Sequence, residues 1–181
     1  MAAAEEKKEE KFDLSTKINL DQVKAQGGGF GVCFEDKCSM PTKGKRIFLR
    51  ADYNVPLDDE CKITDTTRIT ATIPTIKKLL ALEPDRLIIT SHLGRPKGQN
   101  KPKLSLAPVV AELEKLLEKK VILVKDWFRD DLEAEVLSKQ DKGAIIVLEN
   151  CRFYIEEEGK GEDKDKNKIK AKEEDVKRFR A

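Results

Sequence analysis

Four short apolar runs, rich in isoleucine and valine, constrain the fold of this chain more than any other feature. They cover residues 46–53, 86–91, 120–124 and 144–149. Runs of this length and composition are typical of strands that are buried on both faces, as in a parallel sheet. The intervals between them carry apolar residues at helical spacing, over residues 69–82, 105–118 and 127–138. Strands that alternate with helices predict an α/β fold, here a three-layer α/β/α, Rossmann-like architecture with a mainly parallel sheet.

The three predicted helices differ in how clearly single residues mark where they begin or are interrupted. Pro74 lies inside the first and is expected either to kink it or to begin its main part. Ser105 is a favourable N-cap for the second. In the third, the residues expected to point inward are Leu132, Val136 and Leu137.

The remaining segments carry weaker signals. Residues 1–12 are charged and lack an apolar face, which predicts a disordered tail. Residues 13–24 suit an edge strand or turn, and the glycine-rich residues 25–43 suit a surface loop or small hairpin. Residues 156–178 are almost entirely charged, as in a solvated loop or exposed helix, and a helix is under way from about Glu173. Because no stop signal follows, we expect the chain to be truncated.

Composition narrows the class of function. Charged residues make up 39% of the 181 residues, but the net charge is only +2, so nothing global favours nucleic-acid binding. No apolar stretch approaches the roughly 20 residues that cross a bilayer. The N-terminus lacks the features of a signal or transit peptide, which predicts a cytoplasmic protein. The four cysteines form no CxxC pair, which favours reduced thiols and no metal site.

Polar side chains follow three of the four predicted strands. They are Arg50, Asp52 and Asn54 after the first, Ser91, His92, Gly94 and Arg95 after the second, and Asn150 and Arg152 after the fourth. Ligands of open α/β sheets bind at the carboxyl ends of the strands. Arginine presents a fork of donors that suits phosphate or carboxylate, and glycine lets backbone approach a ligand. The pattern therefore predicts a site for a small phosphorylated or carboxylated anion.

Each of these residues also has a structural explanation. A lone histidine such as His92 is more often a surface or core residue than a ligand contact. Arg50 can pair with Asp52, Arg152 can lie on the surface, and Arg68 can cap a helix. No complete catalytic motif accompanies them: the GGGFG at 27–31 lacks the spacing of a phosphate loop, and no nucleophile elbow or metal-ligand cluster is present.

Five stretches, in this order, resemble the phosphoglycerate kinase family. They are RADYNVP (50–56), Arg68 in DTTRI, SHLGRP (91–96), KLSLAPV (103–109) and LENCRFYIEEEGK (148–160). The resemblance implies a two-domain α/β enzyme of glycolysis that transfers a phosphoryl group reversibly from 1,3-bisphosphoglycerate to ADP. Its N-terminal domain binds 3-phosphoglycerate or 1,3-bisphosphoglycerate, and its C-terminal domain binds Mg-ADP or Mg-ATP.

The resemblance also implies roles for single residues. Asp52, Asn54 and Arg68 are expected around the carboxyl and hydroxyl end of the substrate, and Arg68 is expected to be catalytic, reaching the transferring phosphoryl group. His92, Arg95 and Arg152 are expected to grip the 3-phosphate. The whole set expected to bind substrate is Asp52, Tyr53, Asn54, Arg68, Ser91, His92, Leu93, Gly94, Arg95 and Arg152. No residue of this chain is expected to hold the nucleotide or a metal.

Two departures from the family pattern qualify this interpretation. About seventeen residues are inserted between Lys24 and the GKR at 44–46, which places an insertion at about 25–42. The sequence also ends before the family's next segment, which supplies another substrate-binding arginine, and before the hinge and the nucleotide domain. We therefore expect a partial N-terminal domain over residues 13–181, inactive alone, from an enzyme that is monomeric when whole.

Two other classes of function stay open. One is a non-catalytic phosphoglycerate-binding module that is complete at 181 residues. The other is an interaction protein that uses the lysines of 160–178 on nucleic acid, which the balanced charge and the lack of interleaved aromatic residues disfavour. A truncated sheet would leave an open edge, so we also expect reduced stability and self-association.

Overall fold

The computed structural model describes residues 43–132, 139–163 and 165–180. All of them belong to one compact unit, Pro41–Ala181. The predicted tail, the 13–24 segment and the 25–42 insertion lie outside the described residues.

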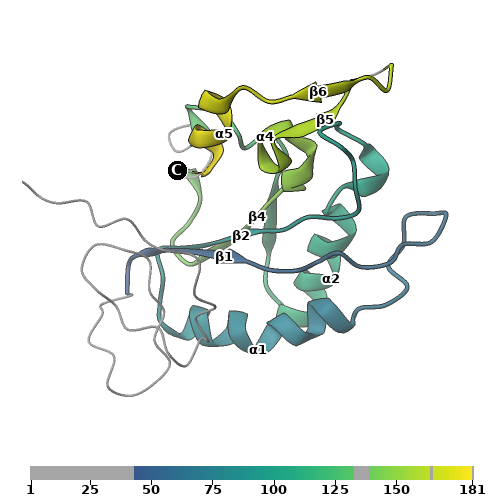
Figure 1. Cartoon of the computed structure of the whole chain (residues 1–181). Helices are drawn as coiled ribbons and strands as arrows, with labels where there is room; N and C mark the ends of the chain where they lie inside the picture. The colour runs from purple at the N-terminus through teal and green to yellow at the C-terminus, as the bar shows by residue number, and fades with distance from the viewer. Residues whose placement is uncertain (1–42, 133–138, 164, 181) are drawn as a thin grey trace, which may run out of the picture. The chain divides into compact units, whose positions relative to one another are not determined.

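A four-stranded parallel sheet forms the centre of this unit (Figure 1). Its order is β1-β2-β4-β3, with bounds Arg46–Arg50 for β1, Arg86–Thr90 for β2, Val121–Val124 for β3 and Ala144–Leu148 for β4. The predicted strands and their parallel arrangement are confirmed. Because the strands pair in register, residues joined across the sheet point to the same face, as Ile47, Leu87 and Ile145 do.

Two helices cover one face of the sheet. They are α1 (Thr67–Ala81) and α2 (Ala107–Leu117), below the strands in Figure 1. Ile69 and Ile76 of α1 are fully buried, as are Leu87 and Ile89 of β2. Burial of such side chains stabilises the fold by about 1.5–3 kcal/mol each.

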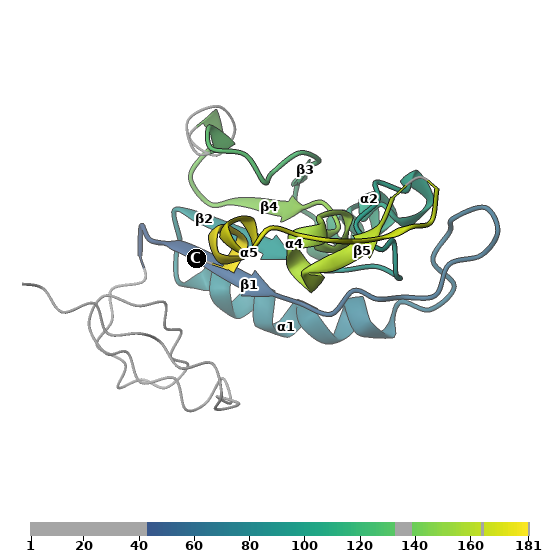
Figure 2. The same ribbon diagram turned by 45° about the horizontal axis from the view of Figure 1, so that its top comes forward.

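A smaller set of elements lies on the opposite face (Figures 1 and 2). They are α4 (Ile155–Glu158), α5 (Glu173–Arg180) and the antiparallel hairpin β5 (Lys160–Glu162) and β6 (Lys168–Lys170). Here Trp127 and Leu132 pack against the buried residues Val124, Ile146 and Leu148. The helix expected from Glu173 is confirmed, whereas the hairpin was not predicted because its residues are charged and carry no apolar alternation.

Aromatic stacking attaches α5 to the rest of the unit. The Phe179 ring lies 5.3 Å from Trp127, 5.1 Å from Phe128 and 6.2 Å from Tyr154, measured between centroids. The Arg178 guanidinium lies 4.9 Å from the Phe128 ring centre. This largely charged helix is thus attached by the Phe179 ring and by the Arg178 guanidinium, which also pairs with Asp130.

The helix limits differ from the prediction in three ways. Helix α1 continues through Pro74, so this residue does not begin it. The N-cap of α2 is Leu106, not Ser105, for a reason given below. Residues 127–131 are not helical, with bends and turns from Phe128 to Asp131, and residues 133–138 lie outside the described residues.

No helix among the described residues is long and apolar enough to cross a membrane.

Candidate functional site

Three loop segments start side by side at the carboxyl ends of β1, β2 and β4, because the strands are parallel and β2 lies between the other two. The Ala51 N–H donates to the Thr90 carbonyl at 3.0 Å, and the Cys151 N–H donates to the Ser91 carbonyl at 3.1 Å. The Tyr53 N–H donates to Ser91 Oγ at 2.9 Å. These bonds extend the sheet beyond its strands and bring the three polar strand ends to one edge.

Three of the residues expected to bind substrate have buried side chains. Tyr53 and Ser91 are fully buried, and Leu93 is 2% exposed. The Tyr53 hydroxyl hydrogen-bonds Thr72 Oγ1 at 3.1 Å, and burial raises the pKa of Tyr53. These side chains fix the positions of the strand ends, so only their backbone groups are available to a ligand.

Asn54 links the first segment to the second. Its N–H donates to Asp52 Oδ1 at 3.1 Å, and its own Oδ1 accepts from the Gly94 N–H at 2.8 Å. Gly94 has a φ of +63°, and a Cβ there would lie 2.9 Å from a methyl group of Leu104. A side chain at position 94 is therefore disfavoured by both conformation and space.

Asn150 links the third segment to the second from inside the protein. Its Nδ2 donates to the Leu93 carbonyl at 2.7 Å and to the Leu104 carbonyl at 2.9 Å. Its Oδ1 accepts from the Arg152 N–H at 3.1 Å. This fully buried amide holds the turn 93–94 against the arginine.

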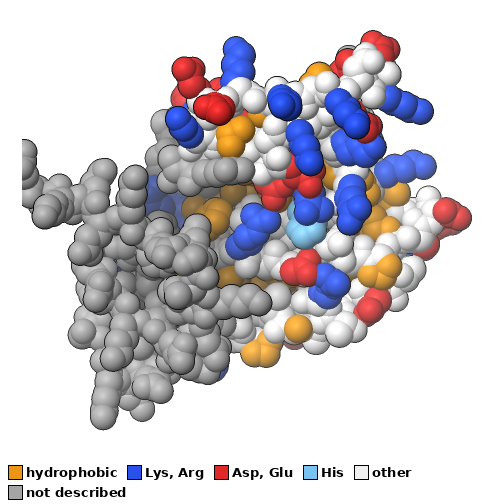
Figure 3. Space-filling model, viewed as in Figure 1, with side chains coloured by type: hydrophobic (Ala, Val, Ile, Leu, Met, Phe, Trp, Pro, Cys, Tyr) orange, Lys and Arg blue, Asp and Glu red, His pale blue; other side chains and the backbone are white. Residues whose placement is uncertain are grey.

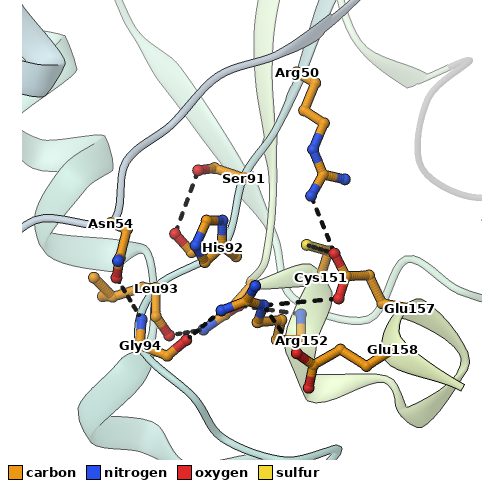
Figure 4. A network of polar contacts seen from close by, with 11 residues as sticks. Arg50, Asn54, Ser91, His92, Leu93, Gly94, Cys151, Arg152, Glu157 and Glu158 are labelled. Atoms are coloured by element: carbon orange, nitrogen blue, oxygen red, sulfur yellow. Dashed lines mark hydrogen bonds and ion pairs between the residues drawn. The ribbon is translucent and has the colours of Figure 1, made fainter. Parts of the chain in front are cut away.

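The Arg152 side chain lies across the Gly94 turn (Figure 4). Its Nη1 donates to the Gly94 carbonyl at 3.0 Å. Its Nε faces the carboxylates of Glu157 and Glu158, each 3.7 Å away. Arg152 Nε itself has no hydrogen-bond partner among the described residues, although it is buried.

The ion pairs at this edge differ from the Arg50–Asp52 pair that the sequence left open as a structural role for Arg50. Arg50 does not pair with Asp52: its Nη2 donates to Glu157 Oε1 at 3.0 Å. Asp52 pairs instead with Arg68, which lies in the first turn of α1. Both members of that pair are half exposed, which brings Arg68 to the site edge without burying it.

Arg95 extends from the same turn into solvent. In the part of the chain that the structure describes, its guanidinium has no ion-pair or hydrogen-bond partner. It is therefore a free, fully charged donor group beside Gly94.

His92 is half-buried among charged groups, at the centre of the face in Figure 3. Burial lowers the pKa of His92 from its ordinary value of 6.5, and the nearby positive charges of Arg152 and Arg50 lower it further. The carboxylates of Asp52 and Glu157 oppose this shift. The imidazole is consequently neutral at pH 7. An anion bound beside it would stabilise its protonated form.

Glu149 is a supporting residue that the sequence analysis did not single out. It is 4% exposed, and its Oε1 accepts from the Leu106 N–H at 2.7 Å and from the Asn150 N–H at 3.0 Å. Its Oε2 accepts from the Ser105 hydroxyl at 2.7 Å. The start of α2 is thus held by both residues: Glu149 accepts from the Leu106 N–H, and Ser105 Oγ accepts from the Ala107 N–H at 3.2 Å. The sequence feature that could have identified Glu149 is its place as a carboxylate directly after an apolar strand.

The two described cysteines, Cys61 and Cys151, form no disulfide. Burial raises the pKa of Cys151 to about 12, so it stays a thiol, and Cys61 is also free. No group of three histidine, cysteine or acidic side chains that could hold a metal occurs in the described ranges. Cys33 and Cys38 lie outside those ranges.

The arrangement is suited to binding an anion rather than to covalent chemistry. Arg50, Arg95 and Arg152 keep donors that no group in the described part of the chain uses, and His92 lies near Arg50 and Arg152. No nucleophile with an adjacent base is present in the described site. Such a set of donors can form charged hydrogen bonds to an anion.

Comparison with known sequences identifies the family to which this chain is similar. Residues 38–177 match the family model described as phosphoglycerate kinase. A phosphoglycerate kinase of Neurospora crassa is 52% identical over 138 residues, which are 76% of this chain and 33% of that protein. One of Debaryomyces hansenii is 51% identical over 141 residues, covering 78% of this chain and 33% of the relative. The chain thus spans about a third of the length of the curated relatives it matches.

Solved structures agree with these relatives. The phosphoglycerate kinase of Coxiella burnetii superposes with a TM-score of 0.55 at 37% identity, covering 65% of this chain and 28% of the other. The enzyme of Pyrococcus horikoshii superposes with a TM-score of 0.57 at 29% identity over the same shares.

Proposed function

Because this chain belongs to the phosphoglycerate kinase family, we propose that it binds 3-phosphoglycerate or 1,3-bisphosphoglycerate at the carboxyl ends of β1, β2 and β4. The whole protein would then transfer a phosphoryl group reversibly from 1,3-bisphosphoglycerate to ADP. The observation that carries this proposal is the Gly94 turn, where Arg152 donates to the Gly94 carbonyl near His92 and the exposed Arg95 is the next residue.

The phosphate of the ligand is assigned to this turn. Arg95 offers an unpaired guanidinium, Arg152 a partly buried one, and His92 a ring that accepts a proton when an anion approaches. Charged hydrogen bonds from two guanidinium groups are among the stronger polar contacts available to a protein. The bonds of Asn150 to the 93–94 turn and to the Arg152 backbone, and of Arg152 to the Gly94 carbonyl, support this assignment.

The other end of the ligand is assigned to Asp52, Asn54 and Arg68. The Asp52–Arg68 pair lies at the site edge and is open to solvent. A guanidinium at this place is suited to stabilise the charge that spreads over the oxygens of a transferring phosphoryl group. Arg68 is therefore the residue we assign to catalysis, and its salt bridge to Asp52 sets its orientation before the ligand arrives.

The nucleotide is assigned to a part of the protein outside this chain. The chain carries no GxxxxGK[ST] phosphate loop, and it spans about a third of its curated relatives. Mg-ADP or Mg-ATP would supply the phosphoryl acceptor or donor. By analogy with the family, we further propose a monomeric, cytoplasmic enzyme of glycolysis that binds no nucleic acid.

Titration of the full chain with 3-phosphoglycerate, followed by amide NMR, tests the binding site. We expect shifts at Asn54, Gly94 and Arg152, and a loss of about tenfold or more in affinity for Arg95→Ala, since a charged hydrogen bond is worth about 1.5–3 kcal/mol. Lys101→Ala is the matched control, because Lys101 is an exposed cation on the same connection. Glycerate, which lacks the phosphate, should bind much more weakly.

Two outcomes would contradict the site. A well-dispersed spectrum without ligand-induced shifts would mean that the folded chain does not bind the substrate. Equal losses for Arg95→Ala and Lys101→Ala would mean that only the overall charge attracts the ligand.

A further inference from the structure

The Glu157 carboxylate contacts two arginines that come from different strand ends, and lies below Arg50 and beside Arg152 in Figure 4. Its Oε1 accepts from Arg50 Nη2 at 3.0 Å, and its Oε2 lies 3.7 Å from Arg152 Nε. Only 12% of the Glu157 side chain is exposed, against 59% for Arg50 and 22% for Arg152. The family resemblance assigned no role to Glu157.

The Glu157 carboxylate is itself held in place. The thiol of the buried Cys151 donates to Oε1 over 3.8 Å. Its neighbour Glu158 faces only Arg152, at 3.7 Å, and is more exposed. A carboxylate with so little exposure is stable only when nearby groups compensate its charge. Glu157 has hydrogen bonds from Arg50 and Cys151 and an ion pair with Arg152.

The contacts leave the arginines with free donors. A guanidinium carries five N–H donors in a rigid plane, so fixing one edge orients the other. Arg50 gives one nitrogen to Glu157, and Arg152 gives Nη1 to Gly94 while Nε faces Glu157. Both keep at least one nitrogen for a ligand.

We propose that Glu157 is a positioning residue that fixes the guanidinium groups of Arg50 and Arg152 for a phosphate-bearing ligand. This inference rests on the proposed function. Two effects of the carboxylate oppose each other: its negative charge repels an anion, while its contacts remove rotamer freedom from two long side chains before binding. The second effect is the larger one, because the carboxylate is neutralised by the two arginines it holds.

Three variants separate these effects. Glu157→Gln removes one negative charge together with the ion pairs. Glu156→Gln removes the same charge one residue away on α4, where Glu156 has no ion pair or hydrogen bond to any described residue. Glu158→Gln removes the single longer contact to Arg152.

The first measurement needs no ligand. In the full chain, the Nη–H signals of Arg50, whose Nη2 donates to Glu157, and the Nε–Hε signal of Arg152, which is buried and faces Glu157, should be narrow and slow to exchange with water. They should broaden or move in Glu157→Gln and stay unchanged in Glu156→Gln. Unchanged signals in Glu157→Gln would overturn the proposal.

The second measurement is the dissociation constant for 3-phosphoglycerate by calorimetry, with thermal melts to confirm that each variant is folded. We expect a rise of about tenfold for Glu157→Gln, as two side chains regain freedom, and a change within about twofold for Glu156→Gln. Equal effects of the two variants, or tighter binding by Glu157→Gln, would overturn the proposal. If the unmodified chain does not bind the ligand, the proposed function fails, and the arginine signals still decide whether Glu157 positions the two groups.

Discussion

The Asn150 side chain, buried at the end of β4, donates its amide to the Leu93 carbonyl at 2.7 Å, in the turn that follows β2. The same amide group reaches the Leu104 carbonyl, and its oxygen accepts from the Arg152 backbone. One side chain therefore sets the distance between the two segments that carry His92, Arg95 and Arg152. Site geometry and stability are coupled at this residue.

Asn150→Ala should lower the free energy of unfolding by about 3 kcal/mol, since each buried polar group left unpaired costs about 1–3 kcal/mol. Urea denaturation measures this. The control is Asn100→Ala, an exposed position where the change should stay within about 0.5 kcal/mol. Equal midpoints for the two variants would show that Asn150 does not hold the segments together.

Gly94→Ala should weaken both folding and substrate binding. Its φ of +63° costs an L-residue about 1–2 kcal/mol, and the added methyl meets the Leu104 side chain at 2.9 Å. Gly143→Ala separates the two causes, because Gly143 has a φ of +79° but no atom within 4 Å of a built Cβ. Both variants should melt earlier, but only Gly94→Ala should lose affinity for 3-phosphoglycerate. Full affinity in Gly94→Ala would exclude the Gly94 turn from the site.

His92 should show a pKa below 6.5 in the free chain, mainly because it is partly buried and then because Arg152 lies near. As the chain has a single histidine, NMR of the imidazole protons follows this titration without assignment. Since the unfolded state binds the proton more readily, His92 should destabilise the fold progressively as the pH falls below about 6.5. His92→Gln should remove this part of the pH dependence.

A bound phosphate should move the same pKa upward. The anion stabilises the imidazolium, so its affinity should increase as the pH falls through the His92 titration. A pKa of His92 that is unaffected by saturating 3-phosphoglycerate would place the phosphate elsewhere.

Phe48 should promote self-association. Within the described residues, β1 pairs only with β2, and the Phe48 ring on this strand is 50% exposed. Open strand edges with apolar side chains are prone to pair with other chains, and lysine at such edges prevents it. Sedimentation should show association that depends on concentration and that Phe48→Lys reduces. Ile169→Lys, at the exposed residue of β6, serves as the control. A monomer at all concentrations would contradict the prediction of an open edge.

Local patterns were sufficient for most of the architecture. Apolar runs and helical spacing predicted β1 to β4, α1 and α2, because burial of a strand or a helix face leaves a periodic trace along the chain. They failed for the β5–β6 hairpin, whose charged residues carry no such trace. They also failed for the residues from Trp127 to Asp131, where the structure has turns.

By itself, the sequence determined the parallel α/β sheet, the family, and the set of polar residues that follow each strand. Only the tertiary structure decided which of these groups meet. Arg50 pairs with Glu157, 107 residues away, and not with Asp52, two residues away. Glu149 supports the start of α2 together with Ser105, and its bond to the Leu106 N–H spans 43 residues. Spacing along a chain reports which side of an element is buried. Charge pairing and hydrogen bonding depend on distances that exist only after the strands have been brought together.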